Sequence, residues 1–154
     1  MMQSPVSVTV KPWGSSLRVK ENTALSKLPL VAIIDDDESV RATTDSLVRS
    51  LGYIVFTFAS AEEFLRSNRL NDLSCVIADV QMPGMSGVEL QAHLLAQGNR
   101  LPFIFFTAFP DERIRAQALR AGAICYLTKP FDGDRLVQGL QDALNKQAGA
   151  GGLD

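Results

Sequence analysis

Short runs of consecutive apolar residues alternate with amphipathic stretches of helical period along most of this chain. The apolar runs predict buried strands, and the stretches between them space their apolar residues three and four positions apart, as a helix with one buried face does. We expect strands at 30–34, 53–58, 74–79, 102–106 and 124–127, and helices at 38–51, 61–69, 86–97, 111–121 and 135–146. This strict alternation predicts an α/β fold with a parallel sheet, and the unbroken apolar character of the strands predicts helices on both of its faces.

The residues at the predicted helix ends agree with this assignment. Gly52, Gly98 and Gly122 each follow a predicted helix, at the position where a left-handed C-cap favours a residue without a side chain. Ser60 precedes the second helix, with Glu63 three residues later, which is the spacing of a capping box. Three helix ends and one helix start are therefore signalled independently of the apolar pattern.

The alternation divides the chain into three parts. Residues 1–28 lack it and hold scattered Pro, Gly, Ser and Thr, which predicts an extended or disordered arm, although Trp13 and alternating valines leave a small docked strand as an alternative. Residues 29–147 form the predicted domain. Residues 148–154 are rich in Gly and Ala, and we expect a flexible tail there.

Composition and charge exclude several classes of protein. Of 154 residues, 46% are apolar and 21% are charged, which is typical of a globular domain. The net charge of −2 argues against a globally basic surface and hence against direct DNA binding, although residues 1–28 carry four basic side chains and one acidic one. No apolar run approaches the roughly 20 residues of a membrane span, and we expect a cytoplasmic protein.

Polar side chains stand where the predicted strands end, which is where ligands bind in an open α/β sheet. The first strand ends at Asp35 and Asp36, and the third ends at Asp79. Thr107 follows the fourth strand, and Lys129 follows the fifth. In the common strand order 2-1-3-4-5 the first and third strands are neighbours, so the three carboxylates would converge on one crevice with Thr107 and Lys129 beside it.

Such a carboxylate cluster is unfavourable unless a cation joins it, and oxygen ligands suit a hard divalent ion. We therefore expect Mg²⁺ at Asp35, Asp36 and Asp79. A hydroxyl and an ammonium beside a metal-bound carboxylate are suited to a phosphoryl group, whose oxygens need compensating donors and charges.

The region from about residue 28 to residue 146 resembles the receiver domains of bacterial response regulators, the phosphorylated components of two-component systems. Receivers of regulators of the nitrogen-fixation type are the most similar in motif. The resemblance rests on collinear segments: Asp35-Asp36-Asp37-Glu38-Ser39-Val40-Arg41, residues 77–87 around Asp79, Thr107-Ala108, and Tyr126-Leu127-Thr128-Lys129-Pro130-Phe131. It implies the flavodoxin-like receiver fold, a doubly wound five-stranded parallel sheet in the order 2-1-3-4-5.

The resemblance also implies the roles of the site residues. Asp79 would be the nucleophile that accepts a phosphoryl group, and Lys129 would pair with it and then with the phosphoryl group. Asp36, Asp79 and the backbone carbonyl of Gln81 would ligate Mg²⁺, with Asp35 acting mostly through a bound water. The Lys129–Pro130 peptide bond is cis in the family.

In the same family Thr107 moves towards the phosphoryl group, Tyr126 turns into the vacated space, and the surface formed by residues 111–121, 124–127 and 135–146 changes. Gln81 and Phe109 occupy positions that commonly tune the lifetime of the phosphoryl group. The acidic residues Asp37 and Glu38 are interpreted as helix-start residues that the helix dipole favours, and not as metal ligands.

We expect a stand-alone signalling switch and not an enzyme, beyond catalysis of its own phosphorylation and dephosphorylation. Its partners would be a sensor histidine kinase or histidine phosphotransfer protein and a downstream protein target, and a homodimer is compatible with the sequence. Roles as a phosphate sink or as a phosphorelay intermediate stay open as alternatives. A more remote alternative is a phosphatase of the haloacid dehalogenase type with Asp35 as nucleophile, since Asp35 and Asp37 reproduce its Asp-x-Asp pattern.

Overall fold

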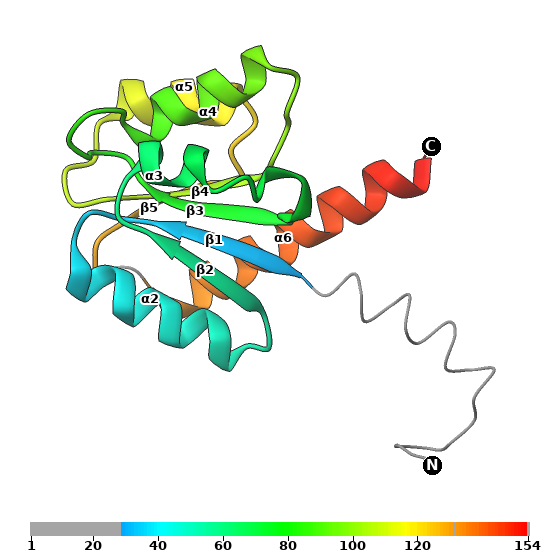
Figure 1. The fold of residues 1–154 in the computed structure, drawn as a ribbon, viewed down its shortest axis with the longest axis horizontal. Coiled ribbons are helices and arrows are strands. Elements are labelled where there is room, and N and C mark those ends of the chain that lie inside the picture. Colours follow the sequence, from blue (N-terminus) through cyan, green and yellow to red (C-terminus); the bar gives the residue numbers. More distant parts are fainter. Residues whose placement is uncertain (1–28, 131, 154) are drawn as a thin grey trace.

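The computed structural model describes residues 29–130 and 132–153, and its centre is one five-stranded sheet (Figure 1). All neighbouring strands are parallel, in the order β2-β1-β3-β4-β5. The strands are β1 (Leu30–Ile34), β2 (Ile54–Phe58), β3 (Cys75–Asp79), β4 (Phe103–Thr107) and β5 (Cys125–Thr128). The predicted sheet and strand order are confirmed, and every strand begins and ends within one residue of its predicted range.

Helices cover both faces of the sheet, as the apolar strands predict. They are α2 (Glu38–Ser50), α3 (Ala61–Arg66), α4 (Gly87–Ala96), α5 (Glu112–Arg120) and α6 (Gly133–Leu153). Helices α2 and α6 lie on one face, and α3, α4 and α5 lie on the other (Figure 1). Alternate strand residues point to opposite faces, so Ile33 joins the core under α2 and α6, whereas Ile34 joins the core under α3, α4 and α5. Two apolar layers therefore hold the sheet in place.

The caps expected from the sequence are present. Gly52, Gly98 and Gly122 all have positive φ angles, between 80° and 105°. The Ser60 side chain accepts a hydrogen bond from the Glu63 N–H at 3.0 Å, but the Glu63 carboxylate accepts from the N–H of Ala59 instead of completing the box. A complete capping box, which the sequence analysis did not predict, starts α4 with Ser86 and Glu89.

Two helices, α3 and α6, have ends that lie more than one residue from the predicted positions. Helix α3 ends at Arg66 because Asn68 has a φ of 60°, and the chain then forms a short 3-10 helix at Leu70–Asp72. Helix α6 continues to Leu153, so the backbone of residues 148–153 is helical where we expected a flexible tail. Gly lowers helix propensity but does not forbid a helix. Once a helix has formed, each residue that extends it contributes one further backbone hydrogen bond.

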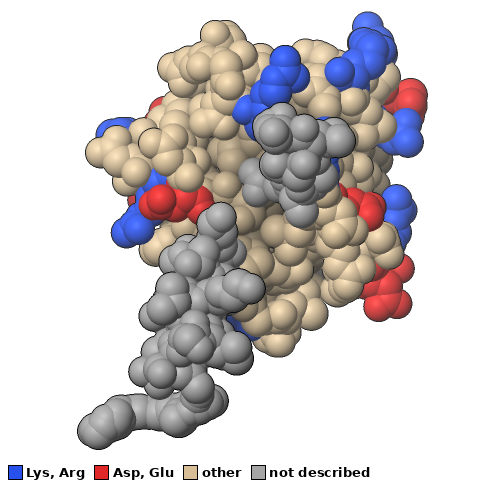
Figure 2. All heavy atoms as spheres, turned by 90° about the vertical axis from the view of Figure 1, so that its right-hand side faces the viewer, with Lys and Arg blue, Asp and Glu red and all other residues tan. Residues whose placement is uncertain are grey.

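The predicted arm and the possible docked strand at Trp13 lie outside the described residues. Within 29–130 and 132–153, no helix is both long and apolar enough to span a bilayer. Figure 2 views the face from which α6 extends, where side chains of both charge signs are scattered among uncharged ones. The described part of that face shows no continuous basic track.

Candidate functional site

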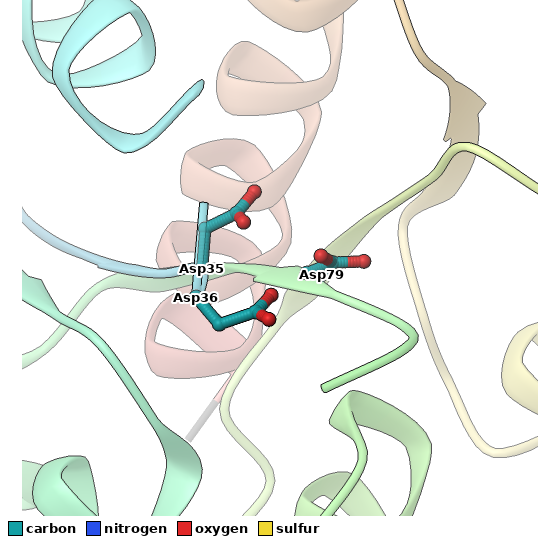
Figure 3. A group of neighbouring side chains, drawn as sticks. All are labelled: Asp35, Asp36 and Asp79. Carbon is teal, nitrogen blue, oxygen red and sulfur yellow. The ribbon is translucent and has the colours of Figure 1, made fainter. Parts of the chain in front are cut away.

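Three carboxylates gather at the carboxyl end of the two central strands. Asp79 is the last residue of β3, and Asp35 and Asp36 directly follow β1, whose last residue, Ile34, is paired with Ala78. One oxygen of each carboxylate lies within 4.8 Å of an oxygen from each of the others, and Figure 3 shows the three side chains together at this edge. Asp35 is 2% exposed and Asp79 is 5% exposed, whereas Asp36 is open to solvent. The convergence expected from the strand order is confirmed.

Lys129 supplies the positive charge that faces this cluster. Its Nζ lies 3.0 Å from Asp79 Oδ2, to which it donates a hydrogen bond, and 3.1 Å from Asp35 Oδ2. Burial raises the pKa of Asp79, and the Asp35 charge raises it further, against the opposing effects of Lys129 and of the Gln81 N–H. Burial alone lowers the pKa of Lys129, but its contacts with the two carboxylates outweigh burial and raise it. One ammonium is therefore shared by two buried carboxylates.

The cluster meets the chemical requirements of a divalent cation site. Within the described residues, the only polar group in contact with the buried Asp35 Oδ2 is Lys129 Nζ, at 3.1 Å in an ion pair that it shares with Asp79. Three carboxylates face one ammonium, so a negative charge remains to be compensated. Carboxylate oxygens are the ligands that Mg²⁺ prefers, and the exposed Asp36 leaves the site open to a hydrated ion.

Backbone groups fix the carboxylates in place. The N–H of Asp37 donates to Asp35 Oδ1 at 2.8 Å, and the N–H of Gln81 donates to Asp79 Oδ1 at 3.1 Å. The Asp37 side chain caps α2 by accepting from the Val40 N–H, which confirms the helix-start interpretation of Asp37. Asp37 therefore caps α2 and is not a member of the cluster formed by Asp35, Asp36 and Asp79.

Arg41 is a site residue that the sequence analysis missed. From the first turns of α2, its Nη1 donates to the backbone carbonyl of Asp35 at 2.7 Å. The bond ties the end of β1 to the helix that follows it, and it places a positive charge behind the cluster. One feature of the sequence could have identified this contact. Arg41 lies six residues after Asp35, early in a predicted helix, where a long side chain can reach back to the end of the preceding strand.

Thr107 and Tyr126 lie on the other side of Asp79. Thr107 ends β4 and is fully buried, and its Oγ1 accepts from the N–H of Phe109 at 3.0 Å. Tyr126 in β5 is 8% exposed, and its hydroxyl oxygen lies 3.5 Å from the N–H of Asp111, which caps α5. Phe109 is 70% exposed. The segment 107–111 therefore links the strand end beside Asp79 to the start of α5.

Two grooves adjoin the cluster. One, of about 490 Å³, is mostly apolar and lies between α2 and the Lys129–Pro130 bond, which is cis. Its lining residues are Ser39, Val40, Thr43, Leu47, Lys129 and Pro130. The other, of about 610 Å³, lies between the loop after Asp79, the start of α4 and the side chains of Ile114 and Gln117 on α5.

Comparison with known proteins places this arrangement in a family. The response regulator receiver domain family matches residues 31–141. The response regulator protein TodT of Pseudomonas putida is 38% identical over 115 residues, which cover 75% of this chain and 51% of TodT. The transcriptional regulatory protein FixJ of Bradyrhizobium diazoefficiens is 34% identical over 116 residues, which cover 75% of this chain and 57% of FixJ. The solved structure of the response regulator StyR has 40% identity and a TM-score of 0.75, covering 80% of this chain and 62% of that chain.

The chain belongs to the response regulator receiver domain family. Receiver domains are the phosphorylation-dependent signalling switches of bacterial two-component systems, and they interact with histidine kinases. The resemblance drawn from the sequence is confirmed, and the haloacid dehalogenase alternative gains no support, since Asp37 caps a helix. The chain spans about half the length of the curated relatives that it matches, and stand-alone action stays a prediction.

Proposed function

We propose that Asp79 accepts a phosphoryl group from a phosphohistidine of a sensor histidine kinase or phosphotransfer protein. In this step an Asp79 carboxylate oxygen bonds to phosphorus, the phosphorus–nitrogen bond breaks, and the histidine ring leaves with its electron pair. The observation that carries the proposal is the position of Asp79: its carboxylate is buried among Asp35, Asp36 and Lys129 at a strand end. Of the three carboxylates, it is the one on β3, and its Oδ1 accepts a hydrogen bond from the N–H of Gln81 at 3.1 Å.

Asp36, Asp79 and the carbonyl of Gln81 would hold Mg²⁺, with Asp35 acting mostly through a bound water. The ion, when bound, supplies positive charge against the phosphoryl oxygens. Lys129 would exchange its contact with Asp79 for one with a phosphoryl oxygen, because its flexible stem already reaches both carboxylates at about 3 Å.

Phosphorylation would be transmitted through Thr107. Its hydroxyl now accepts from the Phe109 N–H, and a phosphoryl group on Asp79 would draw it away as a hydrogen-bond donor. The segment 107–111 leads from Thr107 to the cap of α5, so its movement would reach the surface formed by α5, β5 and α6. Tyr126 is already buried in this structure, with its hydroxyl at the N–H of Asp111. Its role in the switch would therefore be to hold the start of α5.

A protein donor is favoured by the surroundings of the site. The apolar groove at α2 and Pro130 ends at Lys129, so a helix that carries the phosphohistidine would find apolar surface beside Asp79. Gln81 and Phe109 are both exposed near the site, and we propose that they tune the lifetime of the acyl phosphate. As its output, the protein would act as a diffusible effector that binds a protein target and not DNA. A phosphate sink and a phosphorelay intermediate are the alternative roles.

Acetyl phosphate and Mg²⁺ test the chemistry directly. Mass spectrometry should find the phosphoryl adduct on wild-type protein at Asp79 and none on Asp79→Asn. Asp37→Asn is the matched control, because this neighbouring aspartate caps α2 and should leave labelling intact. Labelling that persists in Asp79→Asn and disappears in Asp35→Asn would overturn the assignment in favour of a nucleophile at Asp35.

A second experiment separates the possible outputs. Proteins captured by wild type in the presence of beryllium fluoride, which mimics the phosphoryl group, should differ from those captured by Asp79→Asn. An effector requires at least one target that depends on the mimic. A set of partners indifferent to it would refute the effector and favour a phosphate sink.

A further inference from the structure

The loop between Asp79 and α4 is held firmly at both ends. At its start, the N–H of Val80 donates to Phe106 O at 2.8 Å, and the N–H of Gln81 donates to Asp79 Oδ1. At its end, the capping box of Ser86 and Glu89 fixes the first turn of α4. Between these anchors lie residues 82–85, and the peptide that carries the Gln81 carbonyl leads directly into them.

A side chain from a different helix holds this middle section. Oε2 of Glu62, in the first turn of α3, accepts a hydrogen bond from the N–H of Met85 at 2.9 Å, across 23 positions of the sequence. The same carboxylate lies over Gly84, where a Cβ atom would come within 2.6 Å of Oε2. Gly84 also has a φ of 77°, a backbone conformation that residues with side chains rarely adopt. The loop backbone and the Glu62 carboxylate thus fit closely together.

Glu62 stays charged in this contact. The hydrogen bond from the Met85 N–H is the main cause that lowers the pKa of Glu62. A hydrogen bond from an N–H to an ionised carboxylate is stronger than one between neutral groups. No other side chain outside the loop and α4 is hydrogen-bonded to a backbone N–H of residues 82–85 in the described part of the chain.

We propose that Glu62 is a positioning residue for the phosphoacceptor site, acting through residues 82–85 on the Gln81 carbonyl. This inference rests on the proposed function, in which that carbonyl is a ligand of Mg²⁺. Because the loop is fixed at 80–81 and at 86, the orientation of the 81–82 peptide depends on how the middle section is held. Removing the tie lets this peptide rotate, and the site loses one preorganised ligand.

Glu63 provides a matched control on the same turn of α3. Its carboxylate also accepts a hydrogen bond from a backbone N–H, but from Ala59, which precedes α3 and lies outside the loop. Glu62→Ala and Glu63→Ala therefore remove the same chemical group and the same favourable charge at the start of the helix. Only Glu62→Ala releases Met85.

Mg²⁺ binding by calorimetry and amide hydrogen exchange without metal test the inference, and circular dichroism verifies that each variant is folded. Glu62→Ala should raise the Kd for Mg²⁺ at least threefold and speed exchange at the Met85 amide at least tenfold. Glu62→Gln, which keeps an acceptor oxygen, should lie between Glu62→Ala and wild type. Glu63→Ala should match wild type in both measurements.

A Kd for Glu62→Ala within a factor of 1.5 of wild type would overturn the inference, as would an equal effect of Glu63→Ala. These results differ from a failure of the proposed function, in which the wild type itself would not bind Mg²⁺ or would not take up phosphate on Asp79. If wild type binds Mg²⁺ but is not phosphorylated, the positioning role of Glu62 is still measured by the Kd.

Gly84→Ala provides an independent test of the contact between Glu62 and the loop. Its Cβ would displace the flexible Glu62 carboxylate and would also strain the backbone at a φ of 77°, so this variant should weaken Mg²⁺ binding at least as much as Glu62→Ala does. In the double variant the displaced group is already absent. The two changes should therefore be clearly less than additive in the free energy of Mg²⁺ binding, and full additivity would contradict the contact.

Discussion

Gly87 is the residue whose substitution should disturb both the fold and the site. It begins α4, and a Cβ atom there would overlap the backbone carbonyl oxygen of Asp79 and lie 3.2 Å from Cε1 of Phe105. Neither obstacle yields easily, because Asp79 is paired with Phe106 in the sheet and Phe105 is fully buried. Gly87→Ala should therefore push the start of α4 away from β3, the strand that ends at Asp79.

Two opposing effects set the magnitude. Alanine is favoured over glycine inside a helix by about 1 kcal/mol, whereas forcing extra atoms into a packed interior costs about 1–3 kcal/mol, occasionally more. Since the obstructing atom belongs to the backbone, we expect the clash to prevail and to lower the free energy of unfolding by about 2 kcal/mol. For a chain of this length, that corresponds to a fall in Tm of roughly 4–8 °C.

Gly133→Ala is the matched control, because Gly133 is also the first residue of its helix. There the nearest atom to a new Cβ is Cδ2 of Leu47, 4.0 Å away, so the substitution should leave the stability unchanged or raise it by up to about 1 kcal/mol. Urea unfolding measures both variants, and the rate of phosphate uptake from acetyl phosphate should fall only for Gly87→Ala. If Gly87→Ala were as stable and as active as Gly133→Ala, the close packing of α4 on Asp79 would be refuted.

Three further predictions concern the thiols, the lifetime and the metal. Burial raises the pKa of Cys125 to about 11 and also raises that of Cys75, so at pH 8 roughly one Cys125 thiol in a thousand is ionised, against about a quarter of unperturbed thiols. Ellman's reagent should therefore label the native protein about 100-fold more slowly than the unfolded protein, and similar rates would contradict the burial. Phe109→Ala should shorten the lifetime of the acyl phosphate. It should change the free energy of unfolding by less than about 0.5 kcal/mol, because the ring is 70% exposed. An unchanged lifetime would exclude shielding of the acyl phosphate by Phe109. Mg²⁺ at about 100 times its Kd should stabilise the protein by about 2.7 kcal/mol in a thermal melt, and an equal shift in Asp36→Asn would exclude Asp36 as a ligand.

The fold was predictable because its pattern is local. A strand covered on both faces is apolar at every position, so five such runs between helical stretches define a parallel sheet without knowledge of any contact. The two helix ends that were predicted wrongly depend on the residues just beyond them. Asn68 ends α3 by adopting a positive φ, a conformation that is uncommon for residues other than glycine and was not expected here. At the other end of the chain, the Gly and Ala residues after 147 allow α6 to continue.

The carboxylate cluster was predictable for a related reason. Parallel strands place their carboxyl ends at one edge, so residues far apart in sequence, such as Asp35 and Asp79, come together once the strand order is known. The contacts of Glu62 and Arg41 were not predictable in this way. An acidic residue in the first turn of a helix is already accounted for by the helix dipole, and its contact with Met85 depends on how α3 packs beside a loop.

The sharing of Lys129 links the fold to the chemistry of the site. Its ammonium lies about equally far from Asp35 and Asp79, so a move towards a phosphoryl oxygen would weaken its contacts with both carboxylates at once. Two like charges about 4 Å apart repel by roughly 4 kcal/mol at the effective dielectric constant near a protein surface, and a phosphoryl group adds further negative charge. If Asp79 is phosphorylated as proposed, the single positive charge of Lys129 would not compensate the added negative charge. In the proposed function a second cation, held at Asp36 and Asp79, supplies the missing positive charge, and the metal and the lysine would act together.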